Sequence, residues 1–167
     1  MLIRAERTSD RSRVYSINES AFESPAEADL VDILREQAQP LIALVAEDNG
    51  ELVGHIIFSP VTMAAYPDFK LMGLAPMAVT PEHQRKGIGS QLVRAGLEQC
   101  RQQGSIAVVV LGHPEFYPRF GFSRASRFGI DSVYDVPEEA FMVMELKAGA
   151  FRGKTGTVKY HAAFSSL

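Results

Sequence analysis

The sequence predicts a mixed α/β (α+β) fold with a βαβ unit near its centre. The uninterrupted, β-branched run at 106–111 is typical of a fully buried and often parallel strand. A strongly amphipathic segment at 86–103 precedes it, and a further strand-like run at 71–79 comes before that segment. A strand, a glycine-led helix and a second strand in this order make a βαβ unit. The 167 residues fit one domain, 1–167, with a sizeable core.

The N-terminal part of the chain is predicted to form a strand, two helices and a hairpin. We expect strands at 2–4, 41–47 and 51–63, and helices at 8–21 and 26–38. In the second helix, Leu30, Val31 and Leu34 recur at helical spacing. The hairpin is indicated by Asn49-Gly50, because a tight primed turn favours Asn-Gly.

The remaining elements alternate between strands and helical segments. We expect strands at 71–79, 106–111, 140–147 and 156–164, a helix at 86–103 and a helical turn at 114–122. Pro76 lies inside the first of these strands and cannot donate to a ladder, so it indicates an edge or a bulge. Gly104 is the predicted C-terminal cap of the helix. The apolar face of that helix consists of Ile88, Leu92, Val93, Leu97 and Cys100.

Composition and charge argue against several classes of protein. The net charge of −3 and the lack of a Lys/Arg run disfavour nucleic-acid binding. The apolar runs are too short to cross a bilayer, and the N-terminus has no apolar signal core, so we expect a cytoplasmic protein that does not act at a membrane. The single cysteine, Cys100, excludes an intramolecular disulfide, and the four histidines are scattered, so no metal site is expected.

Three phosphate-binding interpretations compete for the glycines. A Rossmann fingerprint starting at Gly87 would need a third glycine where Leu92 stands. A P-loop near-match at 149–155 has three residues instead of four before its Gly-Lys-Thr, and a strand-like segment follows it, so a loop between strands is expected there. What remains is a helix start with Gly87 and Gly89, where backbone amides can converge on a pyrophosphate. The alternative is a helix N-terminus with incidental glycines.

Two stretches together resemble a known family. "MAVTPEHQRKGIGSQLV" followed by "VVVLGHPEFYPRFGF" resembles the GNAT superfamily of acetyl-CoA-dependent N-acetyltransferases, with its Q/R-x-x-G-x-G/A loop and its "FYxRFGF" helix. The stretches "AFESPAEADLVDILR" and "AFMVMELKAGAFRGKTGTVKYHAAF" resemble a YhbS-like bacterial subgroup. The resemblance covers most of the chain. It implies a mixed, mostly antiparallel central sheet flanked by helices, with a βαβ core that binds the cofactor.

The resemblance implies acetyl-CoA as co-substrate and no metal. The cofactor would lie in a split between the strands at 71–79 and 106–111. Backbone groups of Met77, Ala78 and Val79 would pair with the pantetheine arm. The pyrophosphate would rest on the backbone amides of Arg85, Lys86, Gly87, Ile88, Gly89 and Ser90.

The same resemblance implies two roles for Tyr117. This residue would act as the general acid, and it would also contact the cofactor. A tyrosine with a pKa of about 10 is protonated at neutral pH and can donate to the departing thiolate. The alternative is an aromatic ring that only packs. A bulge at Pro76 would turn the amide of Met77 or Ala78 toward the thioester carbonyl, where it would stabilise the developing oxyanion. A sheet-edge proline without catalytic meaning is equally compatible.

The general base is less clearly marked. An amine with a pKa of about 10.4 must lose a proton before it attacks, and the strand at 71–79 carries no acid. Glu27 is the favoured candidate, although a solvated helical charge is the simpler interpretation of that residue. Glu23 and Asp29 could attract a cationic amine, and Glu145 is a further option. His113 can contact the cofactor, act in proton transfer or be an ordinary loop histidine.

The leading functional prediction is transfer of an acetyl group from acetyl-CoA to a primary amine by direct attack in a ternary complex. A covalent route through Cys100 is disfavoured, because this thiol falls on the apolar helix face about 21 Å from Lys86. The partner is an amine-bearing small molecule or protein, and the resemblance leaves a homodimer as one option. The alternatives are a non-catalytic acyl-CoA-binding or regulatory module, and a nucleotide-binding protein that uses the 149–155 loop.

Overall fold

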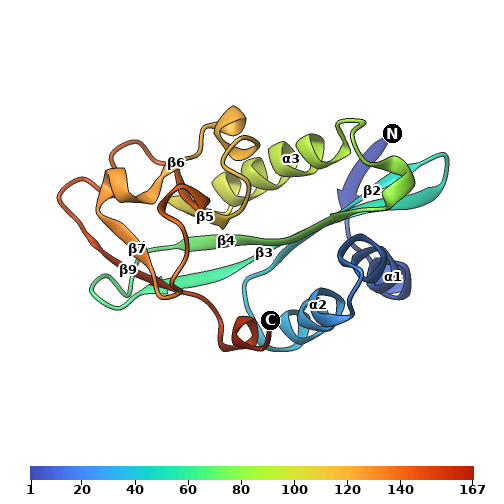
Figure 1. Cartoon of the computed structure of the whole chain (residues 1–167), viewed down its shortest axis with the longest axis horizontal. Coiled ribbons are helices and arrows are strands. Elements are labelled where there is room, and N and C mark those ends of the chain that lie inside the picture. The colour runs from blue at the N-terminus through green and yellow to red at the C-terminus, as the bar shows by residue number, and fades with distance from the viewer.

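A nine-stranded sheet forms the centre of the computed structural model (Figure 1). The structure describes residues 1–167, apart from the side chain of Ser166. Its strands are β1 (Leu2–Ala5), β2 (Ile42–Asp48), β3 (Glu51–Met63), β4 (Leu71–Val79), β5 (Ala107–Leu111), β6 (Ser123–Arg124), β7 (Ile130–Ser132), β8 (Phe141–Glu145) and β9 (Gly156–Lys159). The main path runs β1-β2-β3-β4-β5-β8-β6, and β9 joins β3 to β7. Pairing is antiparallel except between β4 and β5 and between β7 and β9, which confirms the predicted mixed sheet.

Helices cover both faces of this sheet. The helices α1 (Arg11–Phe22) and α2 (Ala26–Gln37) pack on one face, and α3 (Ile88–Gln102) packs on the other (Figure 1). Val14, Ile17 and Leu34 belong to the core between the sheet and the first two helices. Leu92, Val93 and Leu97 belong to the core beneath α3, where Phe58 of β3 is fully buried. Alternate side chains of the central strands therefore feed two separate apolar layers.

The helix α3 confirms the amphipathic pattern, with a corrected start. All five residues of the predicted apolar face are buried, and Cys100 is 0% exposed. The helix begins at Ile88, two residues later than expected, because Gly87 adopts a left-handed φ of +82° and serves as the N-cap. The short connection before the helix therefore includes Arg85 and Lys86.

The predicted bulge in β4 is present. Ala75 and Pro76 of β4 lie opposite the single residue Ile57 of β3. On its other side, β4 pairs with β5 only from Leu71 to Gly73. Beyond Gly73 the two parallel strands separate, so the sheet is split on the side where β5 ends.

The C-terminal elements differ from the prediction. The expected strand at 156–164 is wrong in its second half, because β9 ends at Lys159 and Ala162–Ser166 forms a 3-10 helix beside α2. The strands β6 and β7 were not predicted, since two or three residues are too few for a period-2 pattern. The segment 149–155 forms turns between β8 and β9, as expected for a loop, and no helix follows it as a P-loop requires.

A buried histidine sits under the α1–α2 face of the sheet. His55 of β3 is 0% exposed, and its Nδ1 lies 3.4 Å from Asn18 Nδ2. Its Nε2 lies 3.6 Å from Glu6 Oε1, and Glu6 is itself paired with Arg35. Burial, reinforced by the charge of Arg35, lowers the pKa of His55 to about 3. The imidazole is therefore neutral in the folded protein at all ordinary pH values.

We expect His55 to make folding stability fall as the pH drops below about 6.5. The unfolded chain binds a proton near its ordinary pKa while the folded chain does not, so acid favours unfolding until the pH approaches the folded pKa. Between pH 7 and pH 5 this linkage is worth about 2 kcal/mol. Urea unfolding at both pH values, compared with His55→Gln, measures it. Equal pH dependence in the two proteins would contradict the assignment.

Candidate active site

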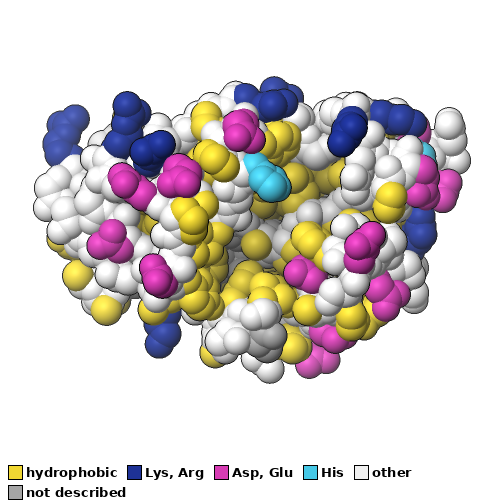
Figure 2. Space-filling view, in the orientation of Figure 1, with side chains coloured by type: hydrophobic (Ala, Val, Ile, Leu, Met, Phe, Trp, Pro, Cys, Tyr) yellow, Lys and Arg dark blue, Asp and Glu magenta, His cyan; other side chains and the backbone are white. Residues whose placement is uncertain are grey.

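A cavity of about 820 Å³ opens where β4 and β5 separate. It appears as a hollow in the face shown in Figure 2, with hydrophobic side chains gathered around it. Its walls come from β4, the connection into α3, the loop after β5 and the α1–α2 region. Leu74 belongs to the core beneath α3 and Leu30 to the core beneath α2, yet both line the cavity. The cavity at this split therefore reaches the apolar cores on both faces of the sheet.

The free edge of β4 presents alternate backbone groups to this cavity. Thr80 N–H donates to Val53 O of β3 at 2.9 Å, which directs the backbone of Thr80 and, two residues back, of Ala78 toward β3. The backbone of Met77 and Val79 therefore faces the opening, and both residues line it. Ala78 does not line the cavity, because its backbone is used by the antiparallel pair.

The N-terminus of α3 forms the second wall. Gln91 N–H donates to Gly87 O at 3.1 Å, so the amides of residues 88–90 precede the first helical bond and have no acceptor within the helix. Arg85 and Gly87 both have left-handed φ values, +64° and +82°, which curl the connection around this end. Free amides and the positive end of the helix dipole make the wall suited to an anion. Arg85, Gly87, Ile88, Gly89 and Ser90 line the cavity, whereas Lys86 is exposed outside it.

Tyr117 stands on the third wall, at the start of the 3-10 helix Tyr117–Phe120. Its side chain is 7% exposed and lines the cavity. The ring lies edge-on to Phe116 and Phe122, with centroid distances of 5.0 and 5.7 Å. Burial raises the pKa of Tyr117 to about 12, so its hydroxyl keeps the proton throughout the physiological range. The ring also packs directly on the backbone of Gly112, where a Cβ atom would approach within 3.0 Å of Tyr117 Cδ2.

Of the four predicted acids, Glu27 is the one that lines the cavity. It lies in the first turn of α2. Glu23 is the C-cap residue that follows α1 and is exposed, and Asp29 accepts a 2.7 Å hydrogen bond from Tyr15 OH. Glu145 accepts from Phe151 N–H at 2.9 Å, away from the cavity.

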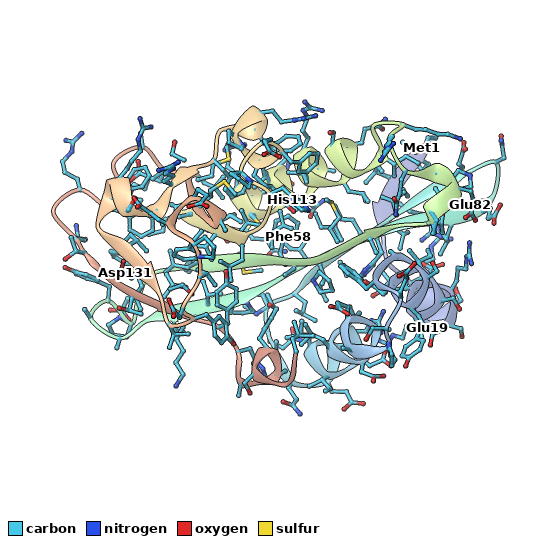
Figure 3. All side chains as sticks on the ribbon, viewed as in Figure 1. Met1, Glu19, Phe58, Glu82, His113 and Asp131 are labelled. Atoms are coloured by element: carbon cyan, nitrogen blue, oxygen red, sulfur yellow. The ribbon has the colours of Figure 1, made fainter. Side chains whose placement is uncertain are left out.

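Several lining residues were not singled out from the sequence. Phe22 and Arg119 reach the cavity from α1 and from the Tyr117 segment, and Arg119 lies 4.9 Å over the Phe116 ring. His113, which the sequence did single out, also lines the cavity, from the loop after β5 (Figure 3). Cys100 does not, and burial raises its pKa to about 12. Phe22 lies in the stretch AFESPAEADLVDILR, but the stretch does not indicate a role for this residue, because only the fold brings the end of α1 to this opening.

Two further observations concern the described residues as a whole. They contain no group of three or more His, Cys, Asp or Glu side chains that could hold a metal ion. None of their helices is long and apolar enough to span a membrane.

Residues 2–125 match the model of the acetyltransferase (GNAT) domain. The full chain is also 39% identical to the N-acetyltransferase YhbS of Escherichia coli K12 over 166 residues, which is 99% of each chain. This chain belongs to the GNAT family. These matches confirm the resemblance seen in the sequence. The protein is therefore an acyltransferase of the N-acetyltransferase type.

Solved GNAT structures share the fold. The crystal structure of E. coli YhbS in complex with CoA superposes with a TM-score of 0.92 at 38% identity, covering 98% of this chain and 91% of YhbS. A GNAT acetyltransferase from Brucella melitensis in complex with acetyl-CoA gives a TM-score of 0.80 at 34% identity, covering 98% and 97% of the two chains. The first of these structures contains CoA, and the second contains acetyl-CoA, the co-substrate that the sequence suggested for this protein.

Proposed function

We propose that this protein transfers an acetyl group from acetyl-CoA to a primary amine by direct attack in a ternary complex. The observation that carries the proposal is the single cavity through the β4–β5 split. It joins an anion-binding helix start, a buried protonated Tyr117 and the carboxylate of Glu27. Two relatives with bound CoA and acetyl-CoA support the choice of cofactor.

The α3 end of the cavity fits the cofactor. In this proposal the amides of residues 88–90 and the connection from Arg85 to Gly87 hold the pyrophosphate, with Arg85 and Lys86 supplying positive charge. The backbone of Met77 and Val79 pairs with the pantetheine arm as a further strand would. Arg119 adds a third cation to the same end.

In this proposal the bulge allows β4 to contribute a backbone N–H group to catalysis. Because Pro76 has no N–H and the ladder is interrupted there, the N–H of Met77 is the first free donor after the bulge on this edge. We place it against the thioester carbonyl, where it stabilises the negative charge that develops during attack.

Two side chains, Glu27 and Tyr117, transfer protons in the proposed reaction. Glu27 takes the proton from the acceptor ammonium, and the freed nitrogen forms a bond to the acetyl carbon. As the C–S bond breaks, Tyr117 Oη donates its proton to the departing sulfur, and the second proton that the new amide nitrogen must lose returns to the Tyr117 phenolate. Cys100 takes no part, because its thiol is buried outside the cavity. We further infer that residues 1–167 act as one N-acetyltransferase domain in the cytoplasm.

Release of CoA thiol from acetyl-CoA, measured while a primary amine is added, tests the reaction. We expect amine-dependent release with one equivalent of acetylated amine found by mass spectrometry. The variant Glu27→Gln should lower kcat by about 100-fold at pH 7. The loss should shrink toward pH 10, because an amine with a pKa of about 10.4 then loses its proton to solvent.

Glu23→Gln is the matched control, since this nearby carboxylate is exposed and does not line the cavity. It should retain the parent rate at every pH. A Glu27→Gln profile that parallels the parent would exclude Glu27 as the base. No CoA release with any amine, despite tight acetyl-CoA binding, would contradict the proposed reaction as a whole.

A further inference from the structure

The end of the cavity near α1 and α2 is the acceptor end in the proposed reaction, and most of its lining is apolar. Its lining near α1 and α2 includes Phe22, Leu30 and Leu167, with Glu27 among them. The other charged side chains that line the cavity, Arg85 and Arg119, are cationic and come from the segments around α3 and Tyr117. Among the described side chains that line the cavity, Glu27 thus has the sole carboxylate.

Phe22 has no evident structural reason to face this opening. It is the last residue of α1 and is 39% exposed, which makes it one of few large hydrophobic side chains left accessible to solvent. An accessible aromatic ring at the mouth of a cavity is typical of a surface that contacts a ligand. Leu30, one turn beyond Glu27, is almost fully buried and continues the apolar wall inward.

Neighbouring acids do not extend the negative charge into the cavity. Asp29 lies two residues after Glu27, on a different side of α2, and accepts a 2.7 Å hydrogen bond from the Tyr15 hydroxyl outside the cavity lining. Glu23 follows Phe22 directly but turns away with a left-handed φ of +54° and lies outside the lining. A second ammonium group on an acceptor would therefore find no second carboxylate side chain in the lining and would lie against apolar side chains, where it would lose hydration.

We infer that the acceptor is a monoamine with an apolar body, of the arylalkylamine type, rather than a polyamine or an aminoglycoside. Glu27 receives its single ammonium group, and Phe22 and Leu30 cover its hydrocarbon or aromatic part. This inference rests on the proposed acetyl transfer and adds the chemical class of the amine to it.

The inference is tested with 2-phenylethylamine and spermidine as acceptors in the CoA-release assay. We expect kcat/KM for 2-phenylethylamine to exceed that for spermidine by at least about tenfold, because an apolar pocket discriminates on this scale. Phe22→Ala should lower kcat/KM for 2-phenylethylamine by about tenfold, mainly through KM, and leave KM for acetyl-CoA unchanged. Phe22→Glu should lower the preference further, because it adds a second carboxylate for spermidine.

Val133→Ala is the matched control for these variants. Val133 is an exposed apolar side chain, 51% accessible, that lies outside this cavity, so its loss should change neither acceptor. Equal or better use of spermidine by the parent, or Phe22 variants with unchanged selectivity, would overturn the acceptor class while acetyl transfer stands. Absence of CoA release with both amines and with every other primary amine would instead remove the proposed function, and the acceptor class with it.

Discussion

Replacement of Tyr117 by phenylalanine is expected to lower kcat by about 100-fold while acetyl-CoA affinity stays within about twofold. The ring is held between Phe116 and Phe122, so its shape and position survive the loss of the hydroxyl. What disappears is the proton donor that faces the cavity. Stopped-flow measurement of CoA release, with calorimetric titration of acetyl-CoA, separates the two effects.

Tyr160→Phe is the matched control for this loss. Tyr160 is also a buried tyrosine whose pKa burial raises, and its hydroxyl has no hydrogen-bond partner, but it lies outside the cavity. Its variant should keep full activity. The pH profile gives a second check, because a hydroxyl with a pKa near 12 cannot cause a fall in rate below about pH 10. Full activity in Tyr117→Phe would refute the acid role.

The second large effect is expected from Gly112→Ala. A Cβ atom at this position would overlap the Tyr117 ring, with 3.0 Å to Cδ2 and 3.3 Å to Cζ. The neighbouring aromatic rings leave little room for retreat, so the phenol must shift relative to the cavity. A displacement of about 1 Å at a catalytic group can cost about 100-fold in rate, so we expect kcat to fall between tenfold and 100-fold.

A double-mutant cycle shows whether Gly112 acts through the Tyr117 hydroxyl. In a Tyr117→Phe background the hydroxyl is already gone, so Gly112→Ala should add little further loss of kcat. Gly156→Ala is the control, since its added Cβ would meet the methyl end of the buried Met63 side chain, and neither residue lines the cavity. Fully additive losses would show that Gly112 affects the rate independently of Tyr117.

Local sequence signals were enough for the elements that carry the cofactor site. The period of the apolar residues defined α3, and the Asn49-Gly50 turn has the two positive φ values that a primed hairpin turn requires. Pro76 predicted the bulge, because a proline has no N–H and interrupts the hydrogen-bond ladder of any sheet. These features depend on residues close together in the chain, so a single sequence contains them.

Features that depend on distant packing could not be obtained in this way. Nothing near Phe22 shows that α1 ends at an opening between β4 and β5. Met77 lines the cavity and Ala78 does not, because of how β4 pairs with β3. This pairing cannot be deduced from the sequence alone. The end of β9 at Lys159 was missed because the apolar residues beyond it pack as a 3-10 helix against α2. Glu27 was preferred by resemblance, and its place in the cavity lining required the fold.

The short pairing of β4 with β5 has a consequence for how the two proton-handling groups are held. Glu27 belongs to the half of the molecule built on β1 to β4, whereas Tyr117 belongs to the half that contains β5, β8 and β6. Along the sheet these halves meet at a parallel seam of three residue pairs, from Leu71 to Gly73. The register of these three β4–β5 pairs therefore helps to set the distance between Glu27 and Tyr117, although neither residue belongs to β4 or β5.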